Sequence, residues 1–157
     1  MQEIYCLVGE IVEASQVIEY NLALIIKYSE FIGKLKEKGR GKRSENVIAG
    51  FEREVDAMHK EISNFTLGQI INKVRDLGIF STSSIDKLYK LLNFRNSLVH
   101  RFFKDNNFNQ IERFGKRYGE IVQSLGEKLR SMQEINFKLC EIINGQQIEF
   151  SNLLKEI

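Results

Sequence analysis

Apolar residues recur at alternating steps of three and four near the start of the chain. The stripe consists of Ile4, Val8, Ile11, Ser15, Ile18, Leu22, Ile25, Ser29 and Ile32. This spacing predicts a single helix over residues 2–36, roughly 50 Å long. The stripe is widened to a broad face by Leu7, Ala14, Tyr28 and Leu35. A face of that width favours a helical bundle over a narrow two-stranded coiled coil.

A second long helix is predicted near the carboxyl-terminal end. Its apolar positions, again spaced by three and four, are Ile111, Phe114, Tyr118, Val122, Leu125, Leu129, Met132 and Leu139. We expect it to begin near Asn109 and to end near Ile143, because Gly145 inside a helix would cost about 1 kcal/mol relative to alanine. Residues 147–157 would then form a short separate helix.

Three shorter helices are predicted between the two long ones, over residues 44–62, 66–77 and 85–103. Ser44 is the expected N-cap of the first. Thr66 and Gln69 have the spacing of a capping box, in which each side chain binds the other residue's backbone N–H. Gly78 is expected to close that helix, and the serine-rich segment 81–84 to cap the next. Residues 104–107 are the expected turn.

The order of these elements predicts an all-α fold. A chain of 157 residues is expected to form one domain, spanning residues 1–157. It contains no proline, which suits long uninterrupted helices and disfavours a loop-rich β fold. We therefore expect an up-and-down helical bundle of about five helices, in which two long helices flank shorter ones.

A charged residue interrupts the apolar stripe of the helix predicted over 85–103. Six apolar residues lie within about 60° of Arg95 on a helical wheel, namely Leu88, Leu91, Leu92, Leu98, Val99 and Phe102. A charge within such a stripe is costly unless it is paired. Asn96 and His100 are four residues apart on a neighbouring face, so their side chains can hydrogen-bond. The three polar residues indicate chemistry rather than packing alone.

The segment Arg95-Asn96-Ser97-Leu98-Val99-His100 resembles the signature of the HEPN superfamily. That signature is an arginine, a polar residue that is often asparagine, and then a histidine a few positions on, within a small all-α bundle. The predicted order of helices agrees with the family over most of the chain. In HEPN toxins paired with nucleotidyltransferase antitoxins, a tyrosine follows the histidine by two positions, where this chain has Phe102. The resemblance therefore implies a different antitoxin or regulatory protein, or a different HEPN branch.

Active HEPN proteins are metal-independent ribonucleases, so the resemblance implies an RNA substrate and no cofactor. His100 would move the proton of the RNA 2′-hydroxyl or of the leaving 5′-oxygen. Arg95 would hold the scissile phosphate and neutralise its growing charge. Asn96 would fix the orientation of the imidazole. Because the 2′-hydroxyl is the nucleophile, DNA should be spared.

Arg95 and His100 are about 140° apart on a regular helix, so they do not converge on one phosphate within one chain. The resemblance implies a symmetric homodimer in which two such helices meet. Alternatively, Arg95 only pairs with a buried acid such as Glu54 or Glu120, and His100 is a surface histidine. Both interpretations remain open at the level of sequence.

Basic residues near the motif are candidates for RNA binding. The formal net charge is only +2, so an RNA site must be a local patch. Arg101, Lys104 and Lys90 lie close to the motif in the sequence. A second group, in the glycine-containing charge run that follows the first helix, comprises Lys38, Arg40, Lys42 and Arg43. These cations could grip phosphates or could simply be solvated.

Other features narrow the function classes. Cys6 and Cys140 are expected to be buried and reduced. Asp56 and His59 have half of the spacing of a di-iron site, but the second copy is missing, so no metal is expected. No apolar run approaches the roughly 20 residues that cross a bilayer, and no signal-peptide pattern is present, so we expect a cytoplasmic protein.

The leading hypothesis is a HEPN-type endoribonuclease that acts as a toxin or as an antiphage or stress-defence effector. The first alternative is a catalytically inactive HEPN module for dimerisation or partner binding. The second is an unrelated helical adaptor in which the motif is coincidental.

Overall fold

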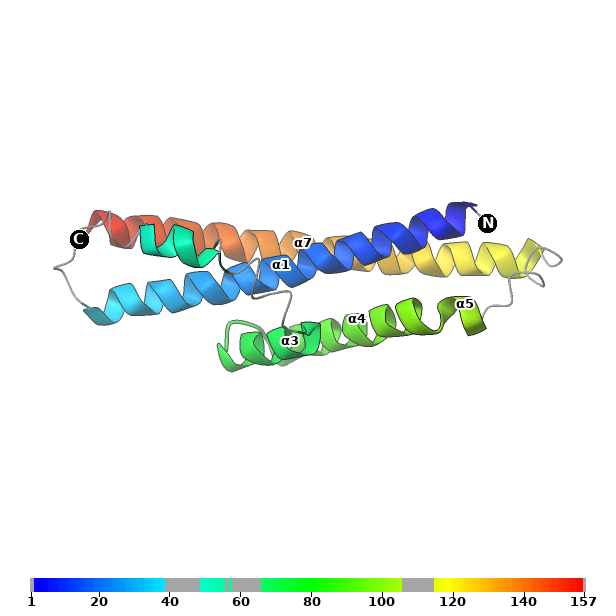
Figure 1. Ribbon diagram of the computed structural model, residues 1–157, viewed down its shortest axis with the longest axis horizontal. Helices are drawn as coiled ribbons and strands as arrows, with labels where there is room; N and C mark the ends of the chain where they lie inside the picture. Colours follow the sequence, from blue (N-terminus) through cyan, green and yellow to red (C-terminus); the bar gives the residue numbers. More distant parts are fainter. Residues whose placement is uncertain (1, 39–48, 56, 58–65, 106–114, 157) are drawn as a thin grey trace.

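The computed structural model describes residues 2–38, 49–55, 57, 66–105 and 115–156. Within these residues every regular element is a helix (Figure 1). The all-α helical bundle predicted from the sequence is therefore confirmed. In the described ranges no helix is both long enough and apolar enough to cross a membrane.

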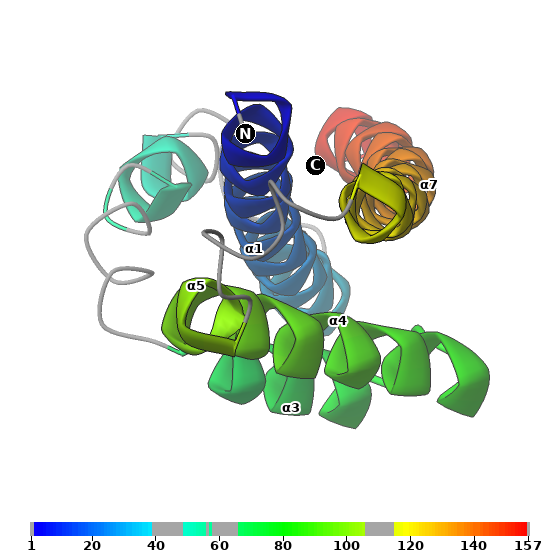
Figure 2. The same cartoon turned by 90° about the vertical axis from the view of Figure 1, so that its right-hand side faces the viewer.

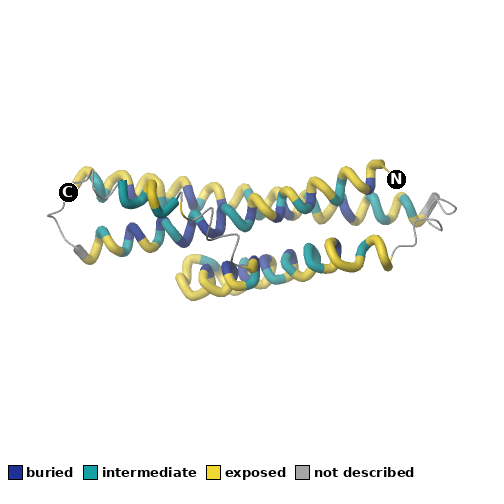
Figure 3. The backbone as a smooth tube through the Cα atoms, in the orientation of Figure 1, coloured by how far each residue is buried: buried dark blue, intermediate teal, exposed yellow. Residues whose placement is uncertain are grey.

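The two long helices are α1 (Gln2–Lys38) and α7 (Gly115–Lys155). They lie side by side and run in the same direction, because the shorter elements between them return the chain to its starting end (Figure 1). The predicted stripe of α1 is buried, and Ile4, Ile11, Ile18, Leu22 and Ile25 are completely inaccessible. Exposed positions alternate with these buried ones along both long helices (Figure 3).

Polar contacts fix the register of this parallel pair. The Asn21 side chain, which is 8% exposed, donates from Nδ2 to Oδ1 of Asn136 at 2.6 Å. Further along both helices, Gln146 Nε2 donates to the Ile25 carbonyl oxygen at 3.2 Å and to Ser29 Oγ at 2.8 Å. A slip of one helix along the other would leave these buried polar groups without partners, which is costly.

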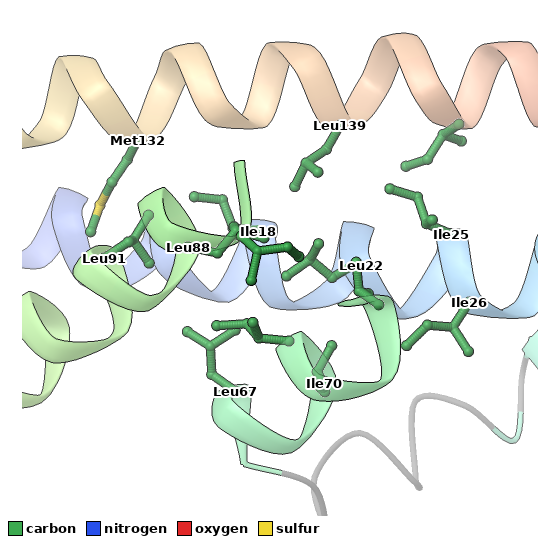
Figure 4. Packing of buried hydrophobic residues seen from close by; sticks show 14 of the residues in the cluster. Ile18, Leu22, Ile25, Ile26, Leu67, Ile70, Leu88, Leu91, Met132 and Leu139 are labelled. Carbon is green, nitrogen blue, oxygen red and sulfur yellow. The ribbon is translucent and has the colours of Figure 1, made fainter. Parts of the chain in front are cut away.

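The second layer is formed by α3 (Leu67–Asp76) and α4 (Thr82–His100), which make an antiparallel pair beneath α1 (Figure 2). The predicted capping box is present, with Thr66 as the N-cap and Gln69 as its partner. Ser81 caps α4 through the Ser84 N–H. Figure 4 shows Leu67 and Ile70 of α3 directed towards Ile18 and Leu22 of α1. Leu88 and Leu91 of α4 join the same core.

Two predicted helix ends are wrong. The final helix does not stop near Ile143, since α7 continues through Gly145 to Lys155. Burial of Ile143 and Phe150 on either side of Gly145 outweighs the small helix penalty of glycine. The helix carrying the motif ends at His100 instead of Phe103, and a short helix, α5 (Phe102–Asp105), follows.

Other expectations about burial and turns also need correction. Cys6 and Cys140 are free thiols as expected, but both are exposed rather than buried. Val99, expected in the apolar stripe, is 51% exposed, whereas the preceding Leu98 is only 2% exposed, so the buried face of α4 near its end lies on the Leu98 side of Arg95. Lys104 and Asp105 belong to α5 and not to a turn. Most of the helix predicted over 44–62, and the predicted start at Asn109, lie outside the described residues.

Substitution by alanine should have opposite effects on the free energy of unfolding at Gly78 and at Gly145. Gly78 has a φ of +67°, a left-handed conformation that costs a residue with a Cβ about 1 kcal/mol or more. Gly145 is helical, and a Cβ there would meet nothing within 4 Å. We expect Gly78→Ala to lower the free energy of unfolding by about 1 kcal/mol and Gly145→Ala to raise it by about 0.5–1 kcal/mol. Urea denaturation followed by circular dichroism measures both, and a stabilised Gly78→Ala would contradict the assignment.

Candidate functional site

The motif residues occupy the last two turns of α4. The helix is started by the Ser81 cap and ends at His100, after which Arg101 leaves the helical conformation with φ −127° and ψ −26°. The Arg101 N–H still donates to the Ser97 carbonyl oxygen at 2.9 Å. His100 is therefore the last helical residue, where the chain turns into α5 and the side chain is exposed.

The Arg95 guanidinium is half-buried and incompletely paired. Its Nε atom is buried and has no hydrogen-bond partner among the described residues. Its Nη1 atom donates to Asn96 Oδ1 at 3.4 Å. Such a partly satisfied cation within an apolar wall is energetically unfavourable in the absence of a ligand.

The carboxylates proposed as structural partners of Arg95 do not bind it. Glu54 instead lies 3.9 Å from Lys27 Nζ and 3.5 Å from Lys34 Nζ. Glu120 is exposed on α7. Among the described residues, Arg95 takes part in no salt bridge. Glu54 and Glu120 are therefore not the acids that interact with Arg95, and the interpretation in which Arg95 pairs with a buried acid depends on a different carboxylate.

The acid that interacts with Arg95 is Glu19 of α1, which the sequence analysis missed. Burial raises the pKa of the Glu19 carboxyl, and the nearby positive charge of Arg95 opposes this by lowering it. A signal for Glu19 was present in the sequence. Glu19, Ala23 and Ile26 are spaced by four and three, and Ala23 and Ile26 are buried, so Glu19 is an acid in a second buried stripe of α1.

Asn96 and His100 share a face as predicted, but the expected hydrogen bond between them is not formed. Asn96 Oδ1 accepts from Arg95 instead. On the helix surface the exposed Val99 lies between Arg95 and His100. Arg95, Asn96, Val99 and His100 thus form a contiguous surface, which we call the motif surface.

The candidate RNA-binding cations are divided between distant places. Arg101 and Lys104 are exposed directly after the motif, and Lys90 is exposed on α4. Lys38 is the last residue of α1, about 28 Å along that helix from Glu19. The remaining members of the basic run, Arg40, Lys42 and Arg43, lie outside the described residues.

Two grooves border α4, and both lie between α4 and α7. Their α4 residues, among them Lys87 and Phe94, point to the side of the helix away from Asn96 and His100. In the part of the chain that is described, no cluster of three or more His, Cys, Asp or Glu side chains could hold a metal ion. Asp56 and His59 fall outside that part.

Removal of Arg95 should change the titration of Glu19 in a defined direction. Because folding raises the pKa of this carboxyl, folding favours its protonated form. Its contribution to stability is full below the unfolded-state pKa, about 4.3, and is lost as the pH rises through the folded-state pKa. Arg95→Met removes the opposing charge, so the Glu19 pKa should rise further. Titration of the Glu19 carboxyl carbon by NMR measures this, and a lowered pKa in Arg95→Met would contradict the electrostatic interaction of Arg95 with Glu19.

The three motif residues are brought together on α4, whereas the basic run at the end of α1 begins far from them. The interpretation of the site thus depends on the motif surface and on the all-α fold. Comparison of the chain with protein-family models, with curated proteins and with solved structures finds no match.

Proposed function

We propose that the protein is a metal-independent endoribonuclease of HEPN type that acts as a homodimer, in the setting of a toxin or a defence effector. A single observation carries the proposal. Within the part of the chain that the structure describes, the Nε atom of the half-buried Arg95 is buried without a hydrogen-bond partner, on the same surface as Asn96 and the exposed His100. A phosphodiester oxygen is the type of acceptor that such a guanidinium lacks.

The chemistry assigned to the motif surface is transesterification. The RNA 2′-hydroxyl attacks the adjacent phosphorus atom and the bond to the 5′-oxygen breaks, leaving a 2′,3′-cyclic phosphate and a 5′-hydroxyl. An imidazole is suited to take the first proton or to supply the second, since it titrates near neutral pH. Arg95 would stabilise the charge that develops on the phosphate oxygens.

A homodimer can bring an Arg95 and a His100 side chain together, although the two residues face different directions on one helix. Arg95 and His100 are about 140° apart around α4, so one cleft is best formed with Arg95 from one chain and His100 from the other. Val99 supports this arrangement, because a 51% exposed valine on the motif surface would gain burial against a second copy of α4.

The test is cleavage of a defined single-stranded RNA by purified protein in the presence of EDTA. Cleavage should persist in EDTA and should yield a cyclic phosphate and a 5′-hydroxyl. A single 2′-deoxy nucleotide at the cleaved position should block the reaction, since the nucleophile is then missing. Cleavage that stops in EDTA, or that tolerates the 2′-deoxy substitution, would contradict the proposal.

A catalytically inactive helical module is the second candidate, and one observation favours it. Asn96 accepts from Arg95 instead of orienting His100, so the imidazole lacks the partner that a positioned base requires. This candidate predicts no cleavage of any RNA and a dimer that is indifferent to His100→Ala. An unrelated helical adaptor would differ from both, because it predicts that Arg95→Met stabilises the fold by removing a buried cation without a function.

A further inference from the structure

Two grooves between α4 and α7 join into one trough. The first, of about 140 Å³, and the second, of about 290 Å³, share Lys87, Ser131 and Ile135 in their walls. We call the joined grooves the α4–α7 trough. Figure 2 shows α7 beside α1 and α4 beneath α1.

The floor of the trough is aliphatic. It is lined by Leu88, Leu91, Met132, Ile135, Leu139 and Ile142. Of these, Ile135 and Ile142 remain only half-buried, although they are on the same helix as the tightly packed core. A floor of this kind favours an apolar side-chain stripe as the occupant.

The rim of the trough is basic. It carries four exposed lysines, Lys87, Lys90, Lys128 and Lys138, and a single acid, Glu134. In the described ranges none of these lysines forms a salt bridge. The whole chain has a formal net charge of only +2, so this concentration of positive charge is local and would select an acidic partner.

The residues of α7 along the trough have the spacing of a helix–helix seam. Lys128, Ser131, Ile135, Lys138 and Ile142 follow one another at steps of three and four. The spacing places these two isoleucines, two lysines and one serine on a single face of α7, and in the described part of the chain the seam is lined only by α4 and the turn before it. The seam extends for about 21 Å, the length of a helix of about 14 residues.

We propose that the α4–α7 trough binds an acidic amphipathic helix of a partner protein. Apolar residues of that helix, at three- and four-residue spacing, lie on the aliphatic floor, and its flanking glutamates or aspartates face the four lysines. RNA is the less suitable occupant, because bases stack on aromatic faces and the Phe94 ring already lies under Lys128 Nζ, 5.6 Å from its centroid. This inference concerns a different side of α4 from Asn96 and His100 and does not depend on nuclease activity.

The probe is a fluorescein-labelled synthetic helix of about four turns, with leucines at three- and four-residue spacing and glutamates on both flanks. Fluorescence anisotropy should show saturable binding to the full-length protein that weakens as salt is added. The double variant Lys87→Glu/Lys138→Glu should lower the affinity about tenfold or more. A matched double variant on the opposite side of α7, Arg130→Glu/Lys155→Glu, makes the same change in net charge and should lower it by no more than about twofold.

A probe peptide of opposite charge shows whether weaker binding by the double variant comes from its changed charge or from misfolding. A peptide with lysine in place of each glutamate should bind the Lys87→Glu/Lys138→Glu protein and not the wild type. The proposal is overturned if the glutamate peptide does not bind, if a scrambled peptide of the same composition binds equally well, or if both double variants weaken binding equally. It is also overturned if oligouridylate, and not the peptide, shows the dependence on Lys87 and Lys138.

Discussion

Replacement of His100 by alanine is expected to lower RNA cleavage by about 10²–10⁴-fold, the usual contribution of a positioned proton-transfer group. The fold should be unaffected, because His100 is exposed at the last position of α4 and exposed substitutions usually change stability by less than about 0.5 kcal/mol. Cleavage of a fluorogenic RNA measures the first effect, and urea denaturation measures the second. Toxicity on expression in bacteria, relieved by His100→Ala, is the simplest first observation.

Arg95→Ala should give a comparable loss, about 10²–10³-fold, since it removes the group that stabilises the phosphate charge. Arg75→Ala, which removes an exposed cation paired with Asp76 on α3, is the matched control and should retain activity. If the single variants Arg95→Ala and His100→Ala both cleave RNA at the wild-type rate, the motif surface is not the active site.

Mixing the two inactive variants tests whether two chains share one site. If Arg95 of one chain acts with His100 of the other, a heterodimer of Arg95→Ala and His100→Ala contains one intact site. Half of the dimers in an equimolar mixture are heterodimers, so about a quarter of the wild-type activity should return. If each site is formed within one chain, every site in the mixture contains one of the two substitutions and no activity returns.

The sequence predicted the long helices well because their burial patterns are regular. The stripe from Ile4 to Ile32 repeats every seven residues over nearly the whole of α1, and local spacing is sufficient to predict such an element. The capping box at Thr66 was equally clear, since it depends only on residues three apart. The end of α7 was not predictable in this way, because Gly145 is retained in the helix by packing of Ile143 and Phe150, a tertiary effect.

The candidate site was predicted only as far as it lies on one helix. The sequence placed Arg95, Asn96 and His100 on α4 correctly, since their relation is set by helical geometry. Its apolar spacing marked Glu19 as an acid in a buried stripe of α1 but could not link it to Arg95, which is 76 positions later in the chain and interacts electrostatically with Glu19 only through the packing of α1 against α4. Nor could it decide which hydrogen bond Asn96 makes, because Arg95 and His100 are both within its reach.

The largest loss of stability from a single side-chain truncation is expected at Ile18. This residue is completely buried where α1 meets both the α3–α4 layer and α7 (Figure 4). Ile18→Ala removes three carbon atoms from that junction and leaves a cavity that the three surrounding elements cannot fill by moving together. Truncations of this kind cost about 2–5 kcal/mol, a large part of the 5–15 kcal/mol that stabilises a typical domain.

Val17 provides the matched control for Ile18, because it is the preceding residue on the same helix and is 40% exposed. Val17→Ala should change the free energy of unfolding by no more than about 0.5 kcal/mol. The difference between the two variants, measured by urea denaturation, separates core packing from the helix propensity of residues in α1, since both changes replace a β-branched residue with alanine. If both variants lowered the free energy of unfolding equally, packing at Ile18 would not hold α1 against α3, α4 and α7. The position of Glu19 near Arg95 would then lose its structural basis.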